Sequence, residues 1–303
     1  MILFYTLIFP GALFALTIGM VGWWLERKVS ALVQHRVGPP WYQNFADVFK
    51  LMGKESIVPE KSTRWLYVVS PLAGVTAAIV LAVLIGMPVF LNINFAGDVI
   101  VIIYTMALGS TAIFLGAAAS SNVYAGIGAG RELKMLLADE LVFVMVVLVP
   151  VIQRGFTLNL KEIITGTPAV FSISGVIAYV VGLLAIQAKL AIQPFDIAEA
   201  ETELAGGVEI EYSGVLLALW KMAKGVHFFV FPMLLAVLFF GVPSRLSLVR
   251  YAWFLLFYVV TLAVLIVIKN VNPRTTIQGV LRFFWKRLSI LAFVAIVLAI
   301  LGV

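Results

Sequence analysis

The sequence predicts an all-α integral membrane protein with about eight transmembrane helices and one amphipathic helix on the membrane surface. Of its 303 residues, 63% are hydrophobic and only 12% are charged. A soluble domain has too little interior to bury that much apolar surface, whereas lipid solvates apolar side chains and demands only a satisfied backbone. Eight apolar runs also reach the roughly 20 residues that a helix needs to cross a bilayer.

The eight runs lie near residues 3–25, 66–90, 99–121, 135–153, 172–193, 213–240, 248–268 and 286–302. The first run is too long for a cleaved signal peptide and lacks the basic residues with which such a peptide starts. We therefore interpret it as a retained span. The sixth run is the least regular because it contains two lysines, a histidine and a proline. No repeat or domain-sized polar loop interrupts the series, which predicts one polytopic membrane domain over residues 1–303.

Most Lys and Arg residues follow the first, third, fifth and seventh runs. Because cytoplasmic loops carry the excess of basic residues, this predicts a cell-membrane protein with both termini outside and the long first loop in the cytoplasm. The same distribution explains the net charge of +6 without a nucleic-acid partner.

The absence of cysteine excludes disulfides, Cys-ligated zinc and Cys-held iron–sulfur clusters in this chain. Two histidines, His35 and His227, are too few to indicate a haem or a metal site. No P-loop, activated nucleophile or dinucleotide fingerprint is found, so we predict no catalytic residue, metal or cofactor in the chain itself.

The first loop, residues 26–65, contains a helical pattern. Phe45, Val48, Phe49 and Met52 follow the spacing of one helix face, and Asp47, Lys50 and Lys54 lie on the other side. This helix is expected to lie along the membrane surface or against a neighbouring subunit, and spacing alone leaves open a lipid-facing helix without a specific role. Before it, Arg27, Lys28 and Arg36 suit acidic partners or lipid headgroups.

Residues 193–214 contain six acidic side chains and no basic one: Asp196, Glu199, Glu201, Glu203, Glu209 and Glu211. Asp196, Glu199 and Glu203 would share one face of any helix formed there. Carboxylates this crowded repel one another, so some are expected to hold protons near neutral pH, as a proton relay requires. The alternative is a hydrated acidic loop, or one paired with basic residues of a partner.

Asp139 and Glu140 lie inside the fourth run. Placing an Asp at that depth costs roughly 2.5–3.5 kcal/mol, so such residues usually have a partner or a water-lined task. We favour a functional role over interfacial acids paired with Arg131 or Lys134.

Lys221, Lys224 and His227 fall three residues apart on one face of the sixth run. Two ammonium groups in a span are expected to face a polar cavity rather than lipid. Lys221 also fits an end-of-span anchor that reaches the interface, and His227 alone fits a packing residue. Lys224 lies deeper in the run, so neither an interfacial anchor nor a packing role explains it easily.

Three stretches together resemble a known family: ERKVSALVQHRVGPPWYQNFADVFKLMGKE (residues 26–55), residues 131–140, and PFDIAEAETELAGGVEIEYSG (residues 194–214). They are similar to the H-type (NuoH-like) membrane subunit of complex I, the NADH:quinone oxidoreductase, and of the energy-converting membrane-bound [NiFe] hydrogenases. The RxGPP form at residues 36–40 and the compact length look more like the M/B-type subunit of the hydrogenase branch. A related sulfane-sulfur reductase branch is not separable on these motifs.

The resemblance implies a subunit without a redox centre that joins a cytoplasmic electron-transfer arm to antiporter-like membrane subunits, with lipid around it. Iron–sulfur clusters and a [NiFe] centre are expected in hydrogenase-like large and small partner subunits, and quinone is a possible ligand in the complex I alternative. A stand-alone ion transporter or channel, or a structural anchor, are the alternatives from other classes. The electron acceptor and the exported ion, H⁺ or Na⁺, stay open.

The resemblance and the charge pattern give two sets of site residues. The expected ion or proton path comprises Asp139, Glu140, Asp196, Glu199, Glu201, Glu203, Glu209, Glu211, Lys221, Lys224 and His227. The expected docking surface and cavity mouth comprise Glu26, Arg27, Arg36, Asp47, Lys50 and Arg131. One departure matters, because many relatives have a Glu in the sixth span where this chain has Lys224.

Overall fold

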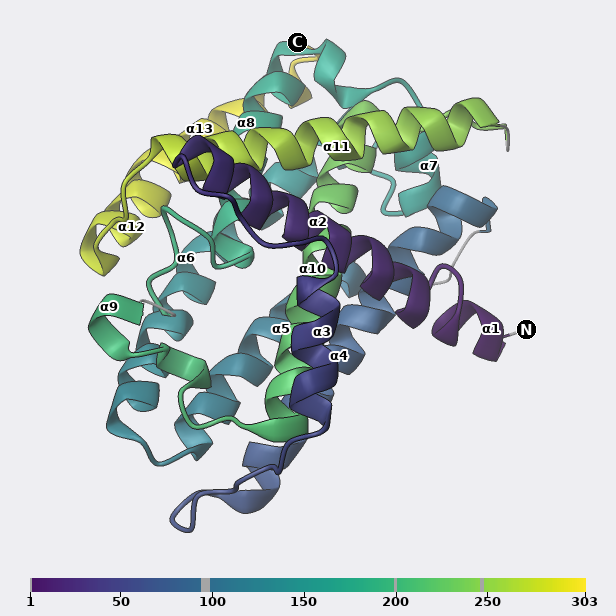
Figure 1. The fold of residues 1–303 in the computed structure, drawn as a ribbon. Helices are drawn as coiled ribbons and strands as arrows, with labels where there is room; N and C mark the ends of the chain where they lie inside the picture. Colours follow the sequence, from purple (N-terminus) through teal and green to yellow (C-terminus); the bar gives the residue numbers. More distant parts are fainter. Residues whose placement is uncertain (1, 94–98, 199–200, 246–247) are drawn as a thin grey trace.

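A computed structural model of the chain describes residues 2–93, 99–198, 201–245 and 248–303 (Figure 1). Within these ranges the structure consists of helices and connecting loops, without a β-strand. The membrane-length elements are α2 (Ala12–Val33), α4 (Arg64–Gly86), α5 (Val99–Ala119), α6 (Val123–Gln153), α10 (Gly214–Phe240) and α11 (Leu248–Val271). The short elements are α1 (Ile2–Leu7), α3 (Gln43–Met52), η1 (Met87–Leu91), α7 (Leu160–Thr165), η2 (Ala169–Phe171), α8 (Ile173–Lys189), α9 (Glu201–Leu204), η3 (Gly207–Glu209), α12 (Ile277–Phe283), η4 (Phe284–Leu288) and α13 (Ser289–Ile300).

Among the described residues, seven helical segments are long and apolar enough to cross a membrane, and α8 is a shorter apolar helix. This confirms the predicted membrane fold. The boundaries differ where charged residues end an apolar run but not the helix. The first segment runs to Val33 instead of residue 25, the fourth begins at Val123 instead of 135, and the last begins at Ile277 instead of 286. At Val123 the Asn122 side chain caps the helix by accepting from the Tyr124 and Ala125 amides.

The helix α10 forms the centre of the bundle and packs against α2, α3, α4 and α11 (Figure 1). Its second half is a continuous buried segment that includes Phe228, Phe229 and Phe239, none of them accessible to solvent. Neighbouring helices therefore enclose this half of α10 on all sides. The first half of α10 instead contains the polar residues of the site.

The connections between spans lie at the two ends of the bundle, where hydrogen bonds join them to one another. The acidic-loop end consists of connections 34–63, 120–122, 190–213 apart from 199 and 200, and 272–276. Thr63 N donates there to Ala119 O, and Thr275 N donates to Pro194 O. At the opposite end, Val242 N donates to Ile164 O, and Ser174 N donates to the last residue, Val303. Connections after odd-numbered spans therefore share one end, as the predicted topology requires; which end faces the cytoplasm stays a prediction.

The helix α3 packs into the groove between α2 and α10 instead of lying free on the surface. Its inward residues are Asn44, Val48 and Leu51, and Asn44 Nδ2 donates to Met20 O at 3.0 Å. Only part of the predicted apolar face is buried, because Phe49 is 72% exposed and Met52 43% exposed. The polar anchor at Asn44 rotates the helix away from the orientation that apolar spacing alone favours.

Candidate functional site

A polar cleft of about 610 Å³ opens at the acidic-loop end between α2, α3, α10, the segment 191–196 and the end of α11. Charged side chains dominate its lining. The acids are Glu26, Asp47 and Asp196, and the bases are Arg27, Lys50, Lys54, Lys221, Lys224, Lys269 and Arg274. The cleft therefore has a surplus of positive charge.

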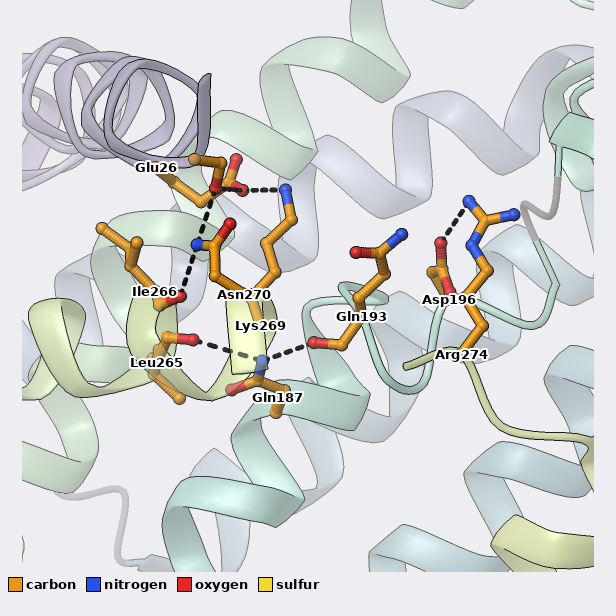
Figure 2. A network of polar contacts seen from close by, with 10 residues as sticks. Glu26, Gln187, Gln193, Asp196, Leu265, Ile266, Lys269, Asn270 and Arg274 are labelled. Carbon is orange, nitrogen blue, oxygen red and sulfur yellow. Dashed lines mark hydrogen bonds and ion pairs between the residues drawn. The ribbon is translucent and has the colours of Figure 1, made fainter. Parts of the chain in front are cut away.

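Each acid of the cleft is paired with a base. Asp196 Oδ2 lies 2.6 Å from Arg274 Nη2, and Asp47 Oδ2 lies 3.8 Å from Arg27 Nη1. Glu26 Oε1 accepts from Lys269 Nζ. Figure 2 shows the Glu26–Lys269 pair and the Asp196–Arg274 pair together. Lys269 belongs to the end of α11, and Arg274 belongs to the turn that follows it. This short segment thus links the first span to the acidic loop.

Glu26 was expected in the first loop, but the structure buries it inside α2 with 2% of its surface exposed. The helix continues past Glu26 because Lys269 neutralises the carboxylate and Ser30 and Asn270 extend the polar contact (Figure 2). Glu26 therefore lines the cleft from a rigid helix.

The acidic loop does not form the single helix on which Asp196, Glu199 and Glu203 would stack. Residues 192–198 contain no regular helix and α9 begins at Glu201, so Asp196 and Glu203 do not share a helix face. Glu203 Oε2 instead lies 2.6 Å from Arg131 Nη1. Glu199 and the side chain of Glu201 lie outside the described part of the structure.

The last two acids of the loop also have partners in this chain. Glu209 forms an ion pair with Lys221, and Glu211 accepts from the Asn122 amide. Asp196, Glu203 and Glu209 are therefore paired with basic residues of the same chain, so the loop is less repulsive than its sequence suggests.

Beside Glu211, the rings of Tyr212 and Tyr67 stack with centroids 4.3 Å apart. The Tyr67 hydroxyl donates to Glu211 O at 2.7 Å, and the Tyr212 hydroxyl donates to Tyr67 O at 3.2 Å. Burial, and after it the neighbouring Tyr67, raises the pKa of Tyr212. Tyr212 therefore stays a neutral hydrogen-bond donor that fixes the acidic loop to α4.

An inner cavity of about 40 Å³ lies behind the cleft, with room for at least one water molecule. Its polar lining comprises Glu132, Lys189, Glu209, Lys224 and His227. Lys224 lines both the cleft and the inner cavity. The face of α10 that carries Lys221, Lys224 and His227 thus lines the cleft and the inner cavity, and Lys224 contributes to both.

The His227 ring stacks on Phe231 with centroids 4.6 Å apart, so His227 both packs and lines the inner cavity.

Asp139 and Glu140 share one buried lysine. Lys189 Nζ, at the end of α8, lies 3.1 Å from Asp139 Oδ2 and 2.5 Å from Glu140 Oε2. The side chains of Lys189 and Asp139 are only 2% and 4% exposed. The alternative partners Arg131 and Lys134 are not used, because Arg131 turns to Glu203. One ammonium group cannot neutralise two carboxylates, so this cluster holds either a net negative charge or an additional proton.

Two further features mark this cluster. The Lys189 Nζ lies 5.1 Å from the Phe143 ring centroid, which adds a cation–π contact. Within the described ranges, Glu140 Oε1 is buried and accepts no hydrogen bond. A buried oxygen without a hydrogen bond costs free energy. Glu140 Oε1 is therefore a position where a proton or a water molecule can bind.

The remaining predicted surface residues separate into two groups. Arg27, Asp47 and Lys50 line the cleft, and Arg27 Nη1 also donates to Asn44 Oδ1 at 2.6 Å. Arg36 is exposed outside the cleft, and Arg131 lies at the edge of a smaller pocket with Glu203. Across the described ranges, no three His, Cys, Asp or Glu side chains gather in a way that could hold a metal ion.

Sequence reasoning missed five charged residues: Glu132, Lys189, Arg250, Lys269 and Arg274. Lys189 is the only base within the run 172–193, and a pair of buried acids in a neighbouring span requires a counter-charge of that kind. Glu132 precedes Asp139 by seven residues, two turns along the same face of α6. Both signals were present in the sequence, but spacing does not show which spans are neighbours.

The fold and the site define a class: polytopic helical membrane proteins whose charged cleft continues into a buried acid–base cluster. Comparisons with known proteins identify the family within that class. The chain belongs to the NADH dehydrogenase family, which it matches over residues 6–300. The predicted resemblance to H-type membrane components of complex I is confirmed.

The chain is similar to the H-type subunit of NADH-quinone oxidoreductase from Brevibacillus brevis, with 34% identity over 94% of this chain and 89% of the relative. It is 33% identical to the same subunit of Geobacillus kaustophilus over 90% of this chain and 86% of the relative. Its structure superposes with a TM-score of 0.88 on a chain of the membrane-bound sulfane sulfur reductase, an archaeal respiratory membrane complex. That match has 26% identity and covers 98% of this chain and 99% of the other.

Proposed function

We propose that this chain couples electron transfer to ion movement as the H-type membrane subunit of a complex-I-like respiratory assembly. The observation that supports this is a series of charged groups leading inward. It starts at the cleft, passes Lys224 and the inner cavity, and ends at Lys189 with Asp139 and Glu140. Ionisable groups held inside spans are expensive, so a connected set of them indicates a task rather than packing.

The proposed mechanism uses electrostatics alone, because the redox centres belong to partner subunits. A change of charge in an arm docked over the cleft alters the field at Lys224 and at the cleft's ion pairs. Lys189 then changes its distance to Asp139 or Glu140, and the released carboxylate takes a proton. Because the local dielectric constant is low, a small charge displacement has a large effect on these groups.

We propose that the assembly is of the ferredoxin-linked type, a membrane-bound [NiFe] hydrogenase or a sulfane-sulfur reductase. The structural likeness to the sulfane sulfur reductase chain supports this assignment, as does the RxGPP form at residues 36–40. Iron–sulfur clusters, a [NiFe] or sulfur-reducing centre and antiporter-like subunits would then be found in the partners.

The names of the bacterial relatives favour the second candidate, a quinone-binding subunit of NADH:quinone oxidoreductase. Affinity purification of the tagged chain from solubilised membranes, followed by identification of the co-purified subunits, separates the two. A nickel–iron or sulfur-reducing large subunit supports our assignment. A quinone-reducing arm with inhibitor-sensitive quinone turnover contradicts it.

The coupling role is tested with Glu140→Gln in the whole assembly, reconstituted in vesicles. We expect electron transfer to continue while the number of ions moved per electron falls severalfold. Glu60→Gln is the matched control, since Glu60 is an exposed residue of the first loop. Full pumping by a normally assembled Glu140→Gln variant would remove Glu140 from the mechanism.

A stand-alone transporter is the alternative from another class. Ion transport by the isolated chain in liposomes, without any partner, would establish that alternative and contradict the subunit assignment.

We further propose that the acidic-loop end faces the cytoplasm and that both termini lie outside. The chain has no cysteine, so single cysteines can be introduced without a background. An impermeant maleimide added to intact cells should label Val303→Cys but not Glu60→Cys. The reverse pattern would contradict this orientation.

A further inference from the structure

A basic cluster lies at the start of the last span, away from the cleft. Arg282, Lys286 and Arg287 are exposed within six consecutive residues. Among the described residues, none of the three forms an ion pair or a hydrogen bond through its side chain. Residues 212–303 contain no Asp or Glu, and the bases of this range that do form ion pairs, such as Lys269 and Arg274, use acids from other segments. The three bases of this cluster have no such partner among the described residues and stay available to an external anion.

The backbone presents the cluster on the outer side of the helix. The buried residues of this span are Val280, Phe284, Leu288, Ala292, Ala295 and Ala299, and the first four follow one another in steps of four. In an α-helix, steps of four residues drift by about 40° per step, so such a stripe would wind around the helix. The π-helical turn η4 (Phe284–Leu288) absorbs the drift, because it closes over five residues instead of four. Phe284 and Leu288 stay buried, and the three bases stay outside.

The surface that follows the cluster along the helix is apolar. Trp285, within the cluster, is 54% exposed, and it is the kind of residue that lies at the membrane interface. Ile290, four residues after Lys286, is 59% exposed, and Val294, four residues further, is 42% exposed. Phe293 beside them is 58% exposed. The cations thus lie at the level expected for a phospholipid headgroup, with the interfacial ring beside them. The apolar stripe that follows lies at the level of the acyl chains.

We propose that Arg282, Lys286 and Arg287 form a binding site for the phosphate of an anionic phospholipid, whose acyl chain lies along Ile290 and Val294. Scattered bases at span ends are ordinary anchors, but three unpaired bases within six residues, beside an exposed tryptophan, provide several donors for phosphate oxygens. Arginine contributes two parallel donors to phosphate oxygens, which favours a held headgroup over a diffuse ionic atmosphere. The site is independent of the coupling function proposed above.

The test is native mass spectrometry of the full-length chain released from nanodiscs that contain equal amounts of phosphatidylglycerol and phosphatidylcholine. The triple variant Arg282→Gln, Lys286→Gln, Arg287→Gln should retain at least about tenfold less phosphatidylglycerol than the unmodified chain, with phosphatidylcholine unchanged. The matched control replaces the exposed Lys61, Arg64 and Lys134 by Gln, which removes the same charge elsewhere. The control should retain phosphatidylglycerol normally.

Three further results decide the proposal. The pair Arg282→Lys, Arg287→Lys keeps the charge and should retain more phosphatidylglycerol than the triple variant but less than the unmodified chain, because lysine lacks arginine's paired donors. This milder variant keeps the proposal testable if the triple variant misfolds. Free glycerol phosphate should not displace the lipid, because it lacks the acyl chain, and displacement would indicate a soluble anion instead. Equal retention by the triple variant and its control would overturn the site. So would normal lipid retention combined with loss of a protein subunit from the purified assembly, which would assign the cluster to a protein partner.

Discussion

The two ends of the bundle hold buried charge in different ways. At the acidic-loop end, bases are matched with carboxylates from other elements, as in the Glu26–Lys269 pair and the Lys189 cluster. At the opposite end, the fully buried Arg250 donates to four backbone carbonyls and to no acid in the described ranges. Its bonds to Pro88 O and Pro243 O are 2.6 and 2.7 Å long. A carbonyl cannot take a proton, whereas a carboxylate can, so of these two arrangements only the acid–base pairs can take up or release a proton.

We infer that the acid–base pairs of the acidic-loop end serve function, whereas Arg250 serves stability. We expect substitutions at Arg250 to change stability without changing the number of ions moved per electron. Substitutions in the Lys189 cluster should change both. Four sets of variants test this distinction, from the largest expected effect to the smallest.

The largest effect is expected from Lys189→Met, which leaves Asp139 and Glu140 buried without a counter-charge. Removing one partner of a buried ion pair costs about 3–5 kcal/mol. Thermal unfolding of the purified chain should therefore occur at a clearly lower temperature. The variant that combines Lys189→Met with Asp139→Asn and Glu140→Gln should recover much of that stability but none of the ion pumping. Normal pumping by the stable triple variant would show that the cluster is only structural.

A smaller loss is expected from Arg250→Met, which removes the donor to the η1 carbonyls of Pro88 and Val89 and to carbonyls of the connection after α10. Unsatisfied buried acceptors should cost about 2–4 kcal/mol in total. The unfolding temperature should fall, while the ratio of ions to electrons in correctly assembled molecules stays normal. A changed ratio would contradict the assignment of Arg250 to stability alone.

Glu26→Gln should have an intermediate effect, because Lys269 keeps 20% of its side chain exposed and can be hydrated. We expect a loss of about 1–2 kcal/mol, less than for a fully buried pair. Limited proteolysis near residues 269–276 should become faster, since the Glu26 contact fixes the end of α11. Unchanged proteolysis would show that the pair does not hold this segment.

The smallest effect is expected from Arg131→Gln, since its partner Glu203 has 62% of its side chain exposed. Exposed pairs contribute less than about 1 kcal/mol, and this contribution should decrease further in high salt. Stability measured at low and high salt checks the prediction. A loss as large as that of Lys189→Met would contradict the contrast between exposed and buried pairs.

The sequence predicted the fold well because hydropathy and length report directly on membrane spans. It also located the functional region, since acids and lysines inside apolar runs are rare and costly. The partners could not be predicted, because ion pairs such as Glu26–Lys269 and Asp139–Lys189 join spans far apart in the chain. Apolar periodicity likewise mispredicted part of the α3 face, where the buried Asn44 rather than Phe49 determines the orientation.

The charged interior is therefore the central claim, and infrared difference spectroscopy of the whole assembly tests it most directly. Spectra recorded before and after reduction of the electron-transfer arm report carboxyl groups that gain or lose a proton. We predict a carboxylic C=O difference band that disappears in Glu140→Gln or Asp139→Asn and persists in Glu60→Gln. A spectrum without such a band, or one that neither substitution at the Lys189 cluster alters, would contradict the proposed coupling role.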